Sequence, residues 1–140
     1  TLDQMYKACD VDLDEYFKFA FIRHPYTRFQ SAFTYFTEVT QTAKNAGFTN
    51  YTQMMTWIEN TNGIKLHVVP QSNWYDDRID QFFQFEEVEQ LSLDKYIPGL
   101  NYNKRSGVIY KSYHPTLDDD LKKRIYNFYK RDFELFNYQP

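Results

Sequence analysis

An arginine and a serine in the segment FAFIRHPYTRFQS, residues 19–31, have the types and the spacing of an anion-binding pair. Arg23 directly follows an apolar run, and Pro25 favours the first turn of a helix because its φ is already fixed near the helical value. On that helix Ser31 falls on the polar stripe, about 9 Å along the axis from Pro25. A guanidinium and a hydroxyl suit a phosphate, although spacing alone favours a surface salt bridge and a solvated serine.

Two elements of the sequence would hold this pair. The near-continuous apolar run from Tyr16 to Ile22 predicts a strand covered on both faces, which favours a parallel sheet. Apolar residues at helical spacing predict a helix from Pro25 to about Lys44. Arg23 would then lie beyond the carboxyl end of a strand, where open α/β sheets bind their ligands.

Three later elements complete the predicted order. A helix is expected over Tyr51–Glu59, capped by Thr49 or Asn50, and a short aromatic strand within Ile79–Glu87. A third helix is expected from Leu117 to about Lys130, because acids at its start and bases in the next turns match the helix dipole. The order strand, helix, helix, strand, helix predicts an open α/β sheet with helices on its faces.

Length and composition restrict the class of protein. A chain of 140 residues with 20% aromatic residues can build one domain, so a single domain over residues 1–140 is expected. A net charge of −3 provides no general basic field for nucleic acid or an anionic membrane. The single cysteine, Cys9, excludes an internal disulfide and a paired-cysteine zinc site. No apolar segment approaches the ~20 residues of a membrane span.

A series of ordered segments resembles one family, the carbohydrate sulfotransferases that use the donor 3'-phosphoadenosine 5'-phosphosulfate, with Golgi-type and bacterial relatives. The run FIRHPYTRFQSAF resembles their 3'-phosphate-binding motif, and HVVPQSNW is similar to their His-x-x-Pro-Gln element. The run IDQFFQFEEVEQ resembles their Asp-then-Phe-Glu strand. NYNKRS and YKRDFELFNY are similar to their Asn-Lys-x-Ser loop and their closing Tyr-x-x-Asp-x-x-x-Phe helix. The likeness covers residues 17–138.

The resemblance implies a three-layer α/β fold like that of the P-loop nucleoside kinases, with a parallel sheet flanked by helices. It implies transfer of a sulfuryl group to a hydroxyl, usually on a sugar, without a metal. Arg23 and Ser31 match the residues that hold the donor's 3'-phosphate. Asn103, Lys104 and Ser106 match the closing loop and are candidate nucleotide contacts, with a solvated turn as the alternative.

Other residues are candidates for the acceptor side or for support. His67 is the candidate general base, with a loop histidine bonded to backbone as the alternative, and Gln71 is a candidate substrate contact. His24 is expected to cap or shape the motif, and Arg28 to support it through an internal salt bridge. Asp80 and Glu86 are alternative candidates for the base, although a structural role is favoured, with Glu86 as a partner of Arg28 or of Arg78.

One expected motif of the family is missing. Residues 1–14 contain no 5'-phosphosulfate loop, since Lys7 lacks Gly, Ser or Thr neighbours, and no GxxxxGK[ST] run occurs in the sequence. The lysine of that loop would stabilise charge on the leaving phosphate. The sequence therefore predicts either the later portion of a longer sulfotransferase, or a domain that has lost the loop.

Two hypotheses on function and location follow. The first is a sulfotransferase whose partners are a nucleotide donor and a hydroxylated, carbohydrate-type acceptor, with no nucleic acid or membrane partner. The second is a noncatalytic nucleotide-binding or interaction module derived from the same fold. Composition predicts a cytoplasmic, bacterial-type protein; the alternative is a lumenal domain of a Golgi membrane protein.

Overall fold

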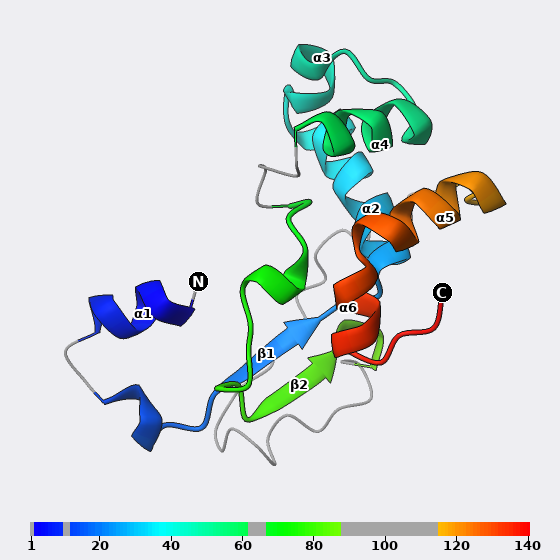
Figure 1. The fold of residues 1–140 in the computed structure, drawn as a ribbon. Coiled ribbons are helices and arrows are strands. Elements are labelled where there is room, and N and C mark those ends of the chain that lie inside the picture. The colour runs from blue at the N-terminus through cyan, green and yellow to red at the C-terminus, as the bar shows by residue number, and fades with distance from the viewer. Residues whose placement is uncertain (1, 10–11, 62–66, 88–114) are drawn as a thin grey trace.

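A computed structural model describes residues 2–9, 12–61, 67–87 and 115–140 of the chain. These residues form a small α/β structure (Figure 1). Its elements, in chain order, are α1 (Leu2–Ala8), a 3-10 turn (Leu13–Glu15), β1 (Phe19–Ile22), α2 (Pro25–Thr34), a π-helical turn (Tyr35–Val39), α3 (Thr42–Ala46), α4 (Tyr51–Asn60), a 3-10 turn (Gln71–Asn73), β2 (Gln81–Gln84), a 3-10 turn (Phe85–Glu87), α5 (Asp119–Phe128) and α6 (Lys130–Leu135). Within these ranges, no helix has the length and apolar run needed to cross a bilayer.

Strands β1 and β2 form a two-stranded parallel sheet, which confirms the predicted parallel pairing. Phe19 lies opposite Gln81, and Ile22 opposite Gln84. Strand β1 begins at Phe19 rather than at the predicted Tyr16, and the segment before it bonds to Asp80. The Lys18 backbone N–H donates to the Asp80 carboxylate at 2.7 Å. Helices α2, α4, α5 and α6 gather beyond the carboxyl ends of both strands (Figure 1).

The start of α2 agrees with the sequence. His24 is the N-cap, and its Nδ1 accepts a hydrogen bond from the Tyr26 backbone N–H at 3.2 Å. The other ring nitrogen lies 3.0 Å from the carbonyl oxygen of Gln139. The capping role expected of His24 is therefore confirmed, and its ring also connects α2 to the end of the chain.

The long helix expected from Pro25 to Lys44 is wrong in its second half. Helix α2 ends at Thr34, and a wide π-helical turn follows in which the Thr40 N–H donates to the Tyr35 carbonyl. The hydroxyls of Thr34, Thr37 and Thr40 each donate to a backbone carbonyl four residues earlier. Such bonds compete with the helical ladder and bend helices, which explains the break.

The two other helices predicted by range, α4 and α5, lie close to their predicted ranges, whereas the helix α1 was not predicted. Asn50 rather than Thr49 caps α4, through a bond from the Gln53 N–H to its side-chain oxygen at 2.9 Å. Helix α5 begins after its N-cap Asp118, so Leu117 lies outside the helix, where its side chain is buried.

The core lies where α2, α4, α5 and α6 meet beyond the sheet. Met54 and Ile58 of α4 and Ile125 of α5 are fully buried there, as is Phe29 of α2 at 1% exposure. The sheet joins this core through Ile22 at the end of β1. The core therefore fixes α2 against the carboxyl end of β1, the position predicted for the anion pair.

Glu86, just after β2, connects three segments of the chain. Its carboxylate accepts hydrogen bonds from the His24 backbone N–H at 3.0 Å, from the Thr27 hydroxyl at 2.9 Å and from the Tyr138 hydroxyl at 3.2 Å. Burial raises the pKa of Glu86, but bonds from its own backbone, His24 and Thr27 lower it more, so the net pKa is below the ordinary value. Glu86 thus has the structural role expected of it.

The partners expected for Glu86, Arg28 or Arg78, are wrong, because both guanidinium groups are bound elsewhere. Arg78 forms ion pairs with Asp76 and with Asp3, and it lies over the Tyr6 ring. These contacts hold α1 to the segment before β2. Glu86 is therefore left to backbone and hydroxyl donors.

The lowered pKa of Glu86 predicts a pH-dependent contribution to stability. A carboxylate whose pKa is lower in the folded state than its unfolded value of about 4.3 stabilises the fold above that pH. This contribution is lost as the pH falls through the folded pKa. We expect Glu86→Gln to lower the free energy of unfolding at pH 7 by less than about 1 kcal/mol, since solvent screens the group, and by less again at pH 3.

Urea unfolding at the two pH values measures this difference. Glu87→Gln is the matched control, because it removes the same charge from the adjacent exposed side chain. An equal loss of stability at pH 7 and pH 3 would contradict the role given to the Glu86 carboxylate.

Candidate functional site

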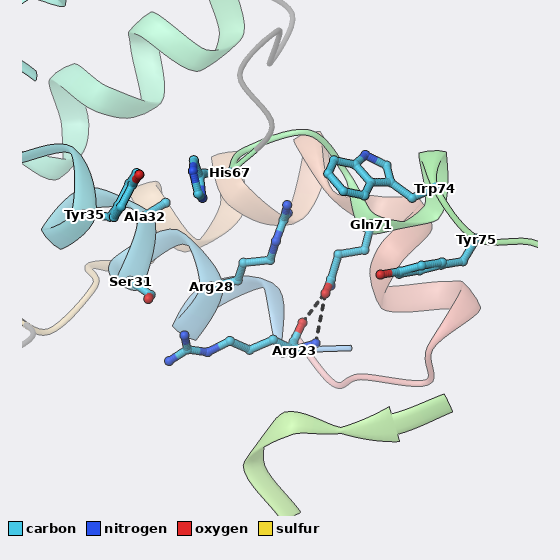
Figure 2. A pocket seen from close by; sticks show the side chains of 9 residues that line it. All are labelled: Arg23, Arg28, Ser31, Ala32, Tyr35, His67, Gln71, Trp74 and Tyr75. Carbon is cyan, nitrogen blue, oxygen red and sulfur yellow. Dashed lines mark hydrogen bonds between the residues drawn. The ribbon is translucent and has the colours of Figure 1, made fainter. Parts of the chain in front are cut away.

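A cleft of about 340 Å³ opens beside the first turns of α2, next to the carboxyl end of β1. Four residues selected from the sequence, Arg23, Ser31, His67 and Gln71, line it together (Figure 2). The other lining residues are Arg28, Ala32, Tyr35, Trp74 and Tyr75. The cleft thus combines two guanidinium groups, hydroxyl and amide groups, and aromatic rings.

Arg23 is held at the end of β1 by a side chain rather than by another strand. Its backbone N–H donates to the Gln71 side-chain oxygen at 3.0 Å, and the Gln71 amide nitrogen donates to the Arg23 carbonyl at 2.8 Å. Figure 2 shows this pair of bonds as dashed lines. The amide of Gln71 therefore satisfies both backbone groups of Arg23 and fixes the point from which its side chain extends.

The guanidinium of Arg23 is only partly used by the protein. Its Nε donates to the Thr27 hydroxyl at 3.2 Å, and its Cζ lies 5.1 Å from the centre of the Phe85 ring. Burial lowers the pKa of Arg23, and the nearby Glu86 carboxylate opposes that shift. Among the described residues, no side chain or carbonyl accepts a hydrogen bond from its two terminal nitrogens. These nitrogens can therefore donate to an anion in the cleft.

Ser31 lines the same cleft from the second turn of α2. Its side chain is half-buried, and its hydroxyl has no hydrogen-bond partner within the part of the chain that the structure describes. In Figure 2 the Arg23 side chain extends toward the side on which Ser31 lies. Both groups that the sequence selected for a phosphate thus have hydrogen-bonding capacity left.

Gln71 is itself positioned by a buried carboxylate. Asp132 of α6 is 0% exposed, and its two oxygens accept the backbone N–H groups of Gln71 and Ser72, each at 2.8 Å. Sequence reasoning missed this role, although Asp132 is the aspartate of the Tyr-x-x-Asp-x-x-x-Phe segment. A carboxylate inside an apolar helix face was the available signal, because such a group needs donors when it is buried.

His67 lies at the rim of the cleft, ahead of this turn. Its side chain is exposed, and its ring lies 4.3 Å from the ring of Tyr35 in the π-helical turn and 5.9 Å from Phe36. The next residue, Val68, is buried, and its carbonyl accepts from the Tyr129 hydroxyl at 2.7 Å. The break after α2 therefore supplies the aromatic surface on which His67 rests.

Arg28 differs from the expectation of an internal salt bridge. Its Nη2 donates to the Val69 carbonyl at 2.7 Å, and its Cζ lies 6.0 Å from the centre of the Tyr129 ring. Burial lowers the pKa of Arg28, with opposing contributions from Tyr129 and Asp132. No ion pair to Arg28 occurs among the described residues, and the Asp132 oxygens accept two backbone N–H groups instead.

Some predicted site residues cannot be placed in the cleft. Asn103, Lys104 and Ser106 lie outside the described residues. Within those that are described, no three His, Cys, Asp or Glu side chains form a group able to hold a metal ion.

The chain belongs to the sulfotransferase family, whose model matches residues 2–139. The family resemblance is thereby confirmed, while its narrower assignment to carbohydrate sulfotransferases stays a prediction. No curated protein and no solved structure matches the chain significantly. Family membership indicates sulfuryl transfer as the class of reaction, with a sulfate donor and an acceptor as partners.

The buried carboxylate predicts a large effect from a small substitution. Asp132→Asn replaces one acceptor oxygen by an amide that donates, so one buried backbone N–H of the Gln71–Asn73 turn loses its partner. We expect the free energy of unfolding to fall by about 1–3 kcal/mol, measured by urea unfolding at pH 7. Glu134→Gln, an exposed carboxylate of the same helix 3.7 Å from Lys130, is the control, and an equal cost for both variants would refute this role.

Proposed function

We propose that this protein acts in sulfuryl transfer from 3'-phosphoadenosine 5'-phosphosulfate to a hydroxyl group, that of a carbohydrate. Membership of the sulfotransferase family supports the reaction class. The observation that carries the choice of donor is the cleft in which Arg23 and Ser31 lie together with unused hydrogen-bonding groups. We assign these two residues to the donor's 3'-phosphate.

The chemistry of the cleft fits a phosphate group. The terminal nitrogens of Arg23 offer a planar pair of donors, and a guanidinium with two donors matches two phosphate oxygens. Ser31 offers one more donor from the neighbouring helix. A site that pairs a 3'-phosphate with these groups discriminates strongly against nucleotides that lack it, because its polar groups would then lose their partner.

We assign His67 and Gln71 to the acceptor side of the reaction. In sulfuryl transfer the acceptor oxygen bonds to sulfur, the bond from sulfur to the donor's phosphate oxygen breaks, and the hydroxyl proton passes to a base. His67 is the candidate base, because its exposed imidazole lines the cleft that also contains Arg23. The rings of Trp74 and Tyr75, both half-buried, line the same cleft and would suit a sugar ring.

The wider architecture is part of the same proposal. We infer a three-layer fold of the P-loop nucleoside-kinase type, of which β1 and β2 are two parallel strands, organised as one domain over residues 1–140. Asn103, Lys104 and Ser106 are proposed as further nucleotide contacts.

Selective binding of a 3'-phosphate tests the assignment of the donor. A ligand that binds only the folded state adds about 2.7 kcal/mol of stability at a concentration about one hundred times its Kd. We expect 3'-phosphoadenosine 5'-phosphate to raise the melting temperature more than adenosine diphosphate, which has its two phosphates at the 5' position. Arg23→Ala should abolish this selectivity.

Arg131→Ala is the matched control for that experiment. Arg131 is an exposed arginine of α6 that does not line the cleft, so its variant should keep the full selectivity. Equal shifts with both nucleotides in the unaltered protein would refute the assignment of the 3'-phosphate.

A second substitution separates chemistry from donor binding. His67→Phe keeps a ring against Tyr35 and Phe36 but removes the nitrogen that could accept a proton. We expect this variant to retain selective stabilisation by 3'-phosphoadenosine 5'-phosphate and to transfer sulfate to sugar hydroxyls roughly 100- to 10,000-fold more slowly. Transfer at the original rate would exclude His67 as the base.

A further inference from the structure

We propose that Thr27 is a positioning residue for the donor's 3'-phosphate, because its hydroxyl directs the Arg23 guanidinium and separates it from the Glu86 carboxylate. This inference rests on the proposed function. Thr27 does not line the cleft, and the motif in which it lies gave no reason to select it. Its role follows from the hydrogen bonds on either side of its hydroxyl.

The Thr27 hydroxyl accepts on one side and donates on the other. It accepts the Nε–H of Arg23 at 3.2 Å and lies 2.9 Å from Glu86 Oε1, with the His24 carbonyl at 3.1 Å as a second acceptor. A hydroxyl has one proton, so it can donate fully to one of these two acceptors. The shorter contact is to the ionised carboxylate, where a hydrogen bond is also stronger.

This arrangement determines which nitrogens of the Arg23 guanidinium can meet a ligand. The Arg23 Nε is bound to Thr27, and the flat side of the guanidinium lies against the Phe85 ring. The two terminal nitrogens are therefore the donors left for the cleft. They form the end-on pair that matches two oxygens of one phosphate. Thr27 therefore selects the end-on approach of the anion.

The same hydroxyl keeps the positive charge of Arg23 available. Both Arg23 and Glu86 lie in the described part of the chain, and no direct ion pair joins them. The Glu86 carboxylate is instead bound by the hydroxyls of Thr27 and Tyr138 and by the His24 backbone. A direct pair would occupy the nitrogens that a phosphate needs.

Replacement of Thr27 by valine removes this hydroxyl at nearly constant volume. The Arg23 Nε then lacks its acceptor, and the guanidinium is free to turn toward Glu86. We expect Thr27→Val to weaken binding of 3'-phosphoadenosine 5'-phosphate about tenfold, the effect of losing one hydrogen bond to a charged group. Binding of adenosine diphosphate should not change.

Calorimetric titration of the full chain with both nucleotides tests the inference. Thr27→Ser restores the hydroxyl and should restore the affinity for 3'-phosphoadenosine 5'-phosphate, a result that a purely structural role for the threonine methyl would not give. Thr34→Val is the matched control, because the Thr34 hydroxyl donates to the Gln30 carbonyl of the same helix instead. Thr27→Ala replaces the valine variant if the latter does not fold.

The outcomes separate this inference from the proposed function. If the unaltered protein prefers 3'-phosphoadenosine 5'-phosphate and Thr27→Val keeps that preference in full, the role of Thr27 is overturned while the donor assignment stands. If Thr27→Val weakens both nucleotides equally, the role is likewise overturned. If the unaltered protein shows no preference, both proposals fail.

Discussion

The buried carboxylate of Asp132 is the constraint on which the rest of the site depends. A fully buried carboxylate is costly unless donors surround it, and here the donors are two consecutive backbone N–H groups of the Gln71–Asn73 turn. The position of this turn lets the Gln71 side-chain amide form hydrogen bonds with both the N–H and the carbonyl of Arg23. The position of an arginine at the end of β1 is thus set by an aspartate 109 residues later in the chain.

The same principle extends along the segment from His67 to Ser72. This segment has little regular structure, so its backbone groups need partners from elsewhere. Tyr129 donates to the Val68 carbonyl and Arg28 to the Val69 carbonyl, while Asp132 accepts the N–H groups of the turn. Side chains from α2, from α6 and from the junction of α5 and α6 therefore hold the segment in place, and with it the His67 imidazole at the rim of the cleft.

Features that depend on neighbouring residues could be predicted from the sequence. The strand, the helix start at Pro25 with its His24 cap, and the parallel pairing follow from local patterning, and the structure contains all three. The break after Thr34 could not be read from apolar spacing, because it arises from threonine hydroxyls that compete for helix carbonyls. Partners distant in sequence, such as those of Arg28 and Asp132, depend on how the helices pack.

The two arginines of the helix-start segment have different roles because their side chains meet different partners. Arg28 points from the first turns of α2 toward the core, where a carbonyl and the Tyr129 ring use its guanidinium. Arg23 precedes the helix, and its half-buried side chain meets the Thr27 hydroxyl and the exposed Phe85 ring. A carbonyl acceptor satisfies a guanidinium nitrogen inside the protein, whereas a hydroxyl at Nε leaves the terminal pair unused. Of the two cations that line the cleft, Arg23 is therefore the one whose two terminal nitrogens both lack an acceptor among the described residues.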